Sequence, residues 1–147
     1  MDRKLHGFCG GPVMLVDIKT GVSTSASSYA AYKILHLGFI ALPLLAGLDK
    51  FFHLLVNWDL YLAPRIASLS PISGHQLMLL FGVIEIIAGL LVALRPRLGS
   101  YVVAAWLWGI IINLLLIPGY YDVALRDFGL SLGALALAQL SREYHPK

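Results

Sequence analysis

Long apolar segments separated by short polar breaks make up most of the sequence between residues 29 and 141. A helix needs about 20 mostly apolar residues to cross the hydrocarbon core of a bilayer, because each residue advances the helix by about 1.5 Å. Segments of sufficient length lie at about 33–56, 75–94, 100–117 and 121–140. None of them alternates polar and apolar residues with a period of two, which argues against a membrane β-barrel. The pattern therefore predicts four membrane-spanning helices.

The breaks between these segments predict how the helices are connected. Residues 95–99 and 118–120 are such short connections that the helices on either side of each must run antiparallel. Residues 57–73 form a longer linker, which we expect to lie along the membrane surface. The expected fold class is all-α: an integral membrane four-helix bundle with up-down-up-down topology, in which residues 29–141 form one domain.

Polar segments flank the predicted bundle. Residues 1–28 end in a run of small polar residues, and we expect them to form a flexible cytoplasmic tail. Their only apolar stretch is interrupted at residues 10–12 by two glycines and a proline, which is not typical of a cleaved signal peptide. Residues 142–147 form a second short polar tail.

The composition supports a membrane location and excludes several other classes. Hydrophobic residues make up 59% of the chain and charged residues only 13%, whereas soluble domains carry roughly 25% charged residues. The basic residues are scattered, so we expect no nucleic-acid partner. A single cysteine, Cys9, excludes an internal disulfide and a cysteine-based zinc site. The sequence holds no motif for a catalytic or metal centre, and we expect neither.

The distribution of basic residues predicts the orientation. With four spans, both termini and the 95–99 turn lie on one side of the membrane, and this side holds eight of the 11 Lys and Arg residues. The positive-inside rule places that side in the cytoplasm, and the membrane is then expected to be the plasma membrane, the inner membrane of a bacterium. Aromatic residues at the opposite interface are expected to act as anchors: Trp58, Tyr61, Tyr120 and Tyr121.

Several charged and polar residues lie inside the predicted spans, although a charge near the centre of a span costs about 2.5–3.5 kcal/mol. On three of the helices these residues fall roughly 20–23 Å from the cytoplasmic boundary, counting about 1.5 Å per residue. Glu85 on the second span lies slightly deeper. We therefore predict one polar cluster inside the bundle, towards the outer face, formed by Asp49, Lys50, His53, Glu85, Asn113, Arg126 and Asp127.

Two interpretations of this cluster stay open. In the first, the residues form interhelical ion pairs and hydrogen bonds that hold the helices in register. In the second, they form a site for a quinone headgroup, a small anion or a proton. The two can coexist, and the first has the greater weight.

Three other features have plainer interpretations. Gly129 and Gly133 form a GxxxG pattern, which favours close helix packing within the bundle over dimerisation. His36 is expected to be a buried, hydrogen-bonded histidine. Trp106 and Trp108 lie two residues apart inside the third span, and we expect them to fill the core or contact lipid rather than stack on a ligand.

The sequence resembles the DoxX family of small membrane proteins over roughly residues 30–141. The resemblance is carried by Gly47-Leu48-Asp49-Lys50-Phe51-Phe52-His53, by residues 82–89, by Arg95-Pro96-Arg97, and by Leu125-Arg126-Asp127-Phe128-Gly129-Leu130. It implies a four-helix subunit that works beside other proteins; the family takes its name from the small subunit of a thiosulfate:quinone oxidoreductase. Cys9 lies outside the matched region.

Three functions are compatible with these observations. The favoured one is a non-catalytic accessory subunit of a larger energy-converting or redox complex in the membrane, which implies lipid and other subunits as partners. The second is a quinone-linked oxidoreductase subunit whose polar cluster binds the headgroup, so the expected ligands are a quinone or a bound lipid. The third is a small proton-coupled transporter, which would require a homo-oligomer because four spans are few.

Overall fold

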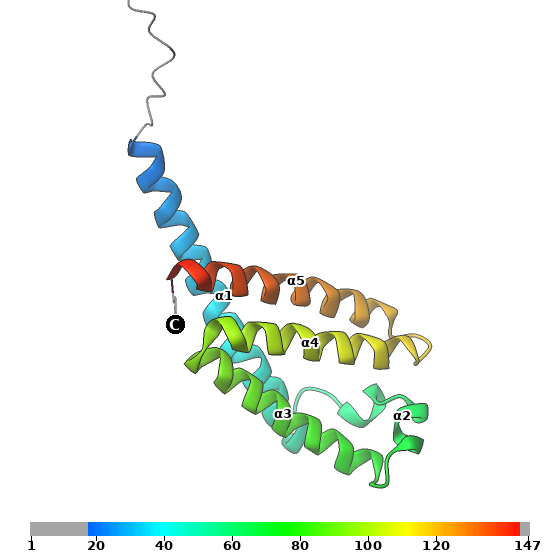
Figure 1. The fold of residues 1–147 in the computed structure, drawn as a ribbon. Coiled ribbons are helices and arrows are strands. Elements are labelled where there is room, and N and C mark those ends of the chain that lie inside the picture. Colours follow the sequence, from blue (N-terminus) through cyan, green and yellow to red (C-terminus); the bar gives the residue numbers. More distant parts are fainter. Residues whose placement is uncertain (1–17, 145–147) are drawn as a thin grey trace, which may run out of the picture.

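The computed structural model describes residues 18–144 and shows an arrangement of helices (Figure 1). Its elements are α1 (Ile18–Phe52), the short 3₁₀ helix η1 (Trp58–Tyr61), α2 (Pro64–Leu69), α3 (Gly74–Leu94), α4 (Pro96–Leu115) and α5 (Tyr121–Tyr144). Four helices are long and apolar enough to cross a membrane: α3, α4, α5 and the Ala26–Phe52 part of α1. The prediction of an all-helical chain with four long apolar helices is confirmed, and no strand occurs in the described range.

Consecutive long helices run in opposite directions, as the short connections predicted (Figure 1). The four long helices form a closed ring. α1 packs most extensively on α3, and α4 on α5, while less extensive contacts join α3 to α4 and α1 to α5. We call the end with Arg95 and Tyr144 the terminal end of the bundle. We call the opposite end, which carries η1, α2 and residues 116–120, the linker end.

α1 differs from the predicted first span at both of its ends. It begins at Ile18 and projects beyond the bundle (Figure 1), so residues 18–28 are helical, although we predicted that they belong to a flexible tail. Extending a helix adds one backbone hydrogen bond per residue and is easier than nucleating one, and residues 18–28 contain no proline. Residues 1–17, including Cys9, lie outside the described part.

The C-terminal end of α1 comes earlier than Val56, where we placed it. Phe52 is the last helical residue, and His53 follows with a φ of 52°. The Asp49 carboxylate accepts hydrogen bonds from the backbone N–H groups of Leu54 (2.9 Å) and Leu55 (3.0 Å). The carboxylate thereby takes the place of the backbone carbonyls to which these two N–H groups would bond if α1 continued. The chain then reverses direction.

The bounds predicted for the 95–99 turn and for the last span also differ from those in the structure. Only Arg95 separates α3 from α4, because Pro96 occupies the start of α4, where its missing N–H costs nothing. Gly99 permits this tight connection: a Cβ there would lie 2.4 Å from the backbone nitrogen of Val92. At the other end of the chain, α5 continues to Tyr144 and so includes residues 142–144, which we assigned to a polar tail.

The linker, which we expected to lie along the membrane surface, contains the short helices η1 and α2 and is hydrogen-bonded to α4. The Asn57 side chain caps η1 by accepting from the N–H of Asp59. The Asn113 amide bridges to the linker backbone: its Oδ1 accepts from the N–H of Ala63 (2.9 Å), and its Nδ2 donates to the carbonyl of Tyr61 (2.6 Å). Asn113 therefore fixes the linker against the end of the bundle.

The main hydrophobic core lies in the terminal half of the bundle and takes residues from all four long helices. Its buried members are Tyr32, Phe39, Ala88, Val92, Val103, Ala104, Ala134 and Leu137. A smaller cluster in the linker half joins Ile111 and Leu114 of α4 to Ala124 of α5. Only the terminal half therefore has a core shared by all four helices.

Glycines set the closest approach between helices, but only one of the predicted pair contributes. A Cβ at Gly47 would lie 2.6 Å from the carbonyl oxygen of Gly82, so the α1 and α3 backbones touch there. Gly133 packs against the ring of Phe39, as predicted. Gly129 has nothing within 4 Å of the position of a Cβ. The prediction that it packs closely against a helix is wrong, because Gly129 borders open space that belongs to a cavity.

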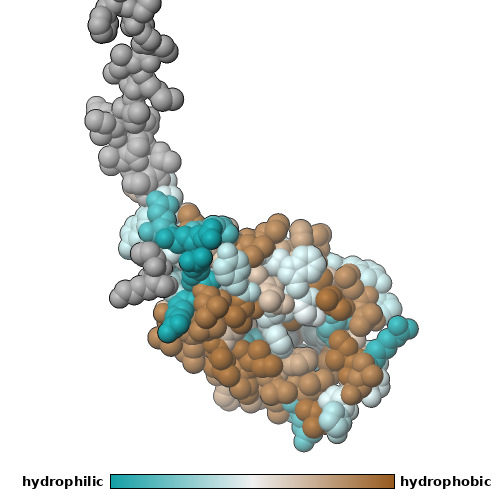
Figure 2. Space-filling view, viewed as in Figure 1, coloured by the Kyte–Doolittle hydropathy of each residue, from teal (hydrophilic) through white to brown (hydrophobic). Residues whose placement is uncertain are grey.

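The outer surface of the bundle is largely apolar. Ile34, Leu37 and Leu45 of α1 are 72%, 69% and 60% exposed, and similar residues occur on α3, α4 and α5. Figure 2 shows apolar residues covering most of the visible bundle, with hydrophilic residues gathered mainly near its ends. Soluble monomers rarely expose continuous apolar surface of this extent.

Candidate functional site

A cavity of about 870 Å³ lies between the helices in the linker half of the bundle. Its walls are mostly apolar side chains of all four long helices and the linker, and Phe39, Ala88 and Val103 of the main core line it towards the terminal end. Polar and aromatic groups on several elements also face it: Lys50, Trp58, Tyr61, Glu85, Trp106, Asn113, Arg126 and Asp127.

The cavity opens to the surface. Of the four contacts that close the helix ring, that between α1 and α5 is the least extensive. Exposed residues of both helices, Leu42 on α1 and Leu130 on α5, line the cavity. From these residues we infer an opening between α1 and α5, on the apolar outer surface.

A buried ion pair forms the polar part of one wall. Lys50 Nζ of α1 donates to Glu85 Oε2 of α3 at 2.6 Å, and the two side chains are only 4% and 8% exposed. Trp106 of α4 donates to the other carboxylate oxygen at 3.4 Å, and the Lys50 ammonium lies 3.8 Å from the ring centroid of Trp58. Both charges therefore have partners, which buried charges need in order to offset their desolvation.

Helix packing brings this pair together. Gly47 and Gly82 each lie three residues before a member of the pair, and their backbones are in contact. The contact places the start of the Lys50 side chain beside Gly82, about one turn from Glu85 on α3, and the long lysine side chain spans the remaining distance. The charges were predictable from the sequence, whereas the role of the glycines in aligning them was not.

Asp49, next to Lys50, has a structural role rather than a place in the cavity wall. Its Oδ1 accepts from the backbone N–H groups of Leu54 and Leu55, and its Oδ2 accepts from Trp58 Nε1 at 2.6 Å. The side chain is buried. These bonds turn the chain after α1 and hold the Trp58 ring over Lys50.

Arg126 and Asp127 line the cavity from α5. Among residues 18–144, neither side chain makes a hydrogen bond or an ion pair within 4.0 Å, although Asp127 lies within electrostatic range of Lys50, Glu85 and Arg126.. Arg126 is exposed and Asp127 is half-buried. This wall therefore offers a cation and a carboxylate that no interhelical bond uses.

The predicted cluster is thus only partly assembled. Lys50, Glu85, Asn113, Arg126 and Asp127 line one cavity, while Asp49 lies directly behind its wall. His53 does not line the cavity, and our prediction that it belongs to the cluster is wrong. The reason is the end of α1 at Phe52, which turns residue 53 out of the helical register that we assumed.

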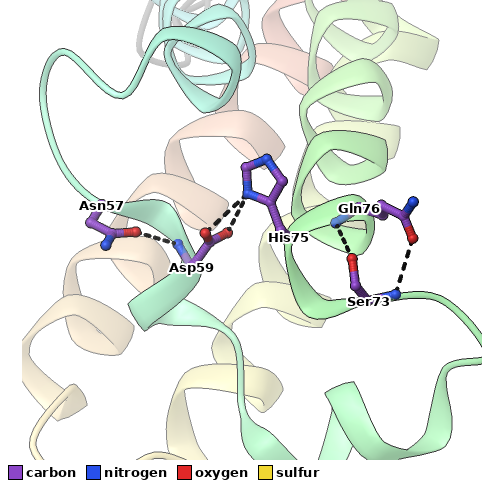
Figure 3. Close-up of polar contacts among 5 residues, drawn as sticks. All are labelled: Asn57, Asp59, Ser73, His75 and Gln76. Carbon is purple, nitrogen blue, oxygen red and sulfur yellow. Dashed lines mark hydrogen bonds and ion pairs between the residues drawn. The ribbon is translucent and has the colours of Figure 1, made fainter.

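His53 instead lies beside the start of α3. Its ring stacks on that of His75, with 5.6 Å between centroids. His75 Nδ1 lies 3.0 Å from Asp59 Oδ2 and 3.3 Å from Oδ1 (Figure 3). The figure also shows Asn57 capping the Asp59 backbone, and the reciprocal bonds of Ser73 and Gln76 at the start of α3. Sequence reasoning missed Asp59 and His75, because this contact depends on how the linker folds back.

The aromatic residues have roles that the sequence suggested only in part. Trp58 and Tyr61, predicted as interfacial anchors, line the cavity, and Tyr61 packs edge-on against Tyr120 at 4.9 Å. Tyr121 is 58% exposed, as an anchor would be. His36 Nε2 bonds to the carbonyl of Val92 at 3.0 Å, so the predicted hydrogen bond is present, but the side chain is half-buried and not buried as we expected.

The role of Trp106 could have been found from the sequence. Glu85 lies 10 residues before Arg95 and Trp106 lies 11 residues after it. In two antiparallel helices joined by a one-residue turn, residues at equal distance from the turn have the same depth. This depth makes the indole N–H of Trp106 a natural partner for the carboxylate, since a buried indole usually finds an acceptor, whereas we expected Trp106 to fill the core or contact lipid.

Comparisons with protein-family models, with curated proteins and with solved structures gave no match to this chain. The geometry of the cavity is therefore the main guide to function.

Proposed function

We propose that this chain is a multi-pass membrane protein whose cavity binds the headgroup of a quinone, and that it acts as a small, non-catalytic subunit of a redox complex in the plasma membrane. The observation that carries the proposal is the cavity of about 870 Å³, which combines apolar walls with a few convergent polar groups. Ligand sites typically have volumes of about 300–1,000 Å³ and this type of lining.

Insertion into a bilayer is supported by four long apolar helices and by their apolar outer surface. The excess of basic residues at the terminal end favours an orientation with both termini in the cytoplasm. In this orientation the cavity lies in the outer half of the membrane, and its opening between α1 and α5 faces lipid. A hydrophobic ligand can then enter laterally from the bilayer.

The groups that face the cavity match the chemistry of a quinone headgroup. Its two carbonyl oxygens accept hydrogen bonds, and the guanidinium of Arg126 is a strong donor that no other side chain uses within residues 18–144. The rings of Trp58 and Tyr61 offer apolar faces beside a planar ring. The isoprenoid tail would lie along the apolar wall towards the opening.

Interhelical bonding alone explains only part of the cluster. The Lys50–Glu85 pair and the bonds of Asp49 and Asn113 join helices and linker, which supports the structural interpretation for these residues. Arg126 and Asp127 join nothing in the described part of the chain, and their charges are costly in a membrane. Ligand binding gives these two residues a role.

The DoxX resemblance supports the subunit role, because it implies a small bundle beside other redox proteins. The region Leu125–Leu130 that carries part of the resemblance contains Arg126 and Asp127 and lines the cavity wall. In this proposal the chain binds and orients the quinone, and its partner subunits carry out electron transfer.

Quinone binding can be measured with the full-length protein in lipid nanodiscs. A short-chain quinone should quench the fluorescence of Trp58 and Trp106 saturably, since both line the cavity. Arg126→Ala should weaken binding by about tenfold to hundredfold, the loss of one charge-assisted hydrogen bond. Arg65→Ala is the matched control, because Arg65 is exposed on α2 and does not line the cavity. Absence of saturable binding, or equal binding by both variants, would refute the proposal.

A further inference from the structure

Two histidines and one carboxylate come together at the linker end, outside the cavity. One potential ligand atom each from His53, Asp59 and His75 lies within 4.8 Å of the others. The three residues come from three segments: the end of α1, η1 and the first turn of α3. We propose that they form a binding site for a first-row divalent transition metal ion of the Zn²⁺ type.

The donor set fits this class of ion. Two imidazoles and one carboxylate leave further positions open for water, as in catalytic zinc sites and in iron sites of the facial-triad type. Hard ions such as Mg²⁺ and Ca²⁺ prefer all-oxygen sites, so they fit less well. The set contains no thiolate, and hence the expected ion is one that imidazole binds well.

The distances fit as well. Metal–ligand bonds of about 2.0–2.1 Å place two donor atoms of a tetrahedral site roughly 3.3 Å apart. His75 Nδ1 already lies 3.0 and 3.3 Å from the two oxygens of Asp59 (Figure 3). A metal ion bound between these atoms would take the place of the contact between His75 and Asp59. His53 completes the set by a small side-chain movement.

The backbone around each ligand is held in place by local bonds. Asn57 caps η1 and thereby fixes Asp59, and the capping box of Ser73 and Gln76 fixes the first turn of α3, which carries His75. His53 is the sole non-glycine residue with positive φ between residues 18 and 144. This left-handed conformation is costly for histidine, and it places the ring beside His75.

The electrostatics and the accessibility also allow binding. Asp59 supplies one negative charge, which offsets the repulsion that the N-terminal end of a helix exerts on a cation. The side chains of His75 and Asp59 are 53% and 40% exposed, so an ion in water can reach them. Leu55, Val56, Trp58 and Tyr61 of the same segment line the cavity. A bound metal would therefore stiffen the segment that covers the linker end of the cavity.

The test is a titration of the purified full-length protein, without a polyhistidine tag, with Co²⁺ as a spectroscopic probe. We expect one Co²⁺ per chain, visible d–d absorption, and displacement by Zn²⁺. Asp59→Asn and His75→Gln should each lower the affinity about tenfold or more. Asp122→Asn, another exposed carboxylate, and His6→Gln, outside the described residues, are the matched controls and should not change it.

A second measurement separates metal binding from a folding defect. Zn²⁺ should raise the thermal unfolding temperature of the parent protein but not that of the triple variant His53→Gln/Asp59→Asn/His75→Gln, whose helicity by circular dichroism should match the parent. Absence of saturable Co²⁺ binding, or equal affinity in the parent and in the triple variant, would overturn the proposal. Neither result depends on whether the cavity binds a quinone.

Discussion

At the terminal end all four long helices meet in one core, in which Val92, Ala134 and Leu137 have no exposed surface, whereas at the linker end the same helices surround a cavity of about 870 Å³. Small side chains such as Ala88, Ala104 and Ala134 allow close packing in the first region. Aromatic and charged side chains line the second. The difference shows that one end of the bundle is closely packed, while the other encloses a space lined by polar and aromatic groups.

Polar bonds hold the linker half together in place of a shared core. Asp49 bonds to Trp58, Lys50 to Glu85, and Asn113 to the linker backbone. Each bond joins segments at the margin of the cavity. In apolar surroundings a polar group that loses its hydrogen-bond partner finds no water to replace it. Breaking such a bond therefore costs the desolvation free energy of the group left unpaired. The linker half is therefore expected to tolerate loss of apolar contacts better than loss of polar ones.

The largest effect is expected from breaking the buried ion pair. Glu85→Ala leaves the Lys50 ammonium buried without its carboxylate partner, which typically costs about 3–5 kcal/mol. The thermal unfolding of the detergent-purified protein measures this loss. The double variant Lys50→Met/Glu85→Leu removes both charges and should recover most of the stability. A single variant as stable as the parent would show that the pair does not hold the linker half together.

A matched pair of leucines tests the core of the terminal half. Leu137→Ala should destabilise the protein by about 2–5 kcal/mol, because Leu137 is fully buried and its removal leaves a void. Leu130→Ala, on the same helix but facing the cavity and the surface, should cost less than about 1 kcal/mol. Denaturation of the two variants under one condition compares the halves directly. Equal losses would mean that both halves are packed alike.

A pair of glycines gives a smaller contrast. Gly82→Ala would place a methyl group 2.8 Å from the carbonyl oxygen of Gly47, so α1 and α3 must separate, at a cost of about 1–3 kcal/mol. Gly129→Ala has open space around it and should stabilise α5 by about 0.5–1 kcal/mol through helix propensity. Unfolding temperatures that shift in opposite directions would confirm the close contact at Gly82; a neutral Gly82→Ala variant would contradict it.

The smallest effect on overall stability is expected from the linker. Trp58→Phe keeps an aromatic ring near Lys50 but removes the N–H that bonds to Asp49, a loss of about 1–3 kcal/mol for the segment. Hydrogen exchange of residues 53–62 should accelerate, while that of the main core should not change. Unchanged exchange in this segment would show that the Asp49–Trp58 bond does not hold it.

Part of this organisation was predictable from the sequence. The apolar segments gave the four long helices and their order, because a bilayer-length apolar run has few other solutions. Counting about 1.5 Å per residue also brought Lys50, Glu85, Asn113, Arg126 and Asp127 to one region. Residue depth is a local quantity, so it can be estimated without knowing how the helices pack.

The parts that depend on contacts between distant residues were not predictable. The Asp49 side chain ends α1 at Phe52 by bonding to the backbone beyond it, and this moved His53 away from the cavity. The contact of His75 with Asp59 depends on the folded linker. The cavity itself arises because α5 diverges from α1 near Gly129. The sequence of a single helix does not show how much space separates that helix from its neighbour.

The central claim is that the space in the linker half serves a ligand and not the fold. Gly129→Trp tests it most directly, because Gly129 lines the cavity and a side chain there has room to enter it. Leu132→Trp, exposed on the same helix and away from the cavity, is the control. In nanodiscs, Gly129→Trp should unfold at the temperature of the control but lose saturable quinone binding. Full quinone binding by the Gly129→Trp variant would contradict the account.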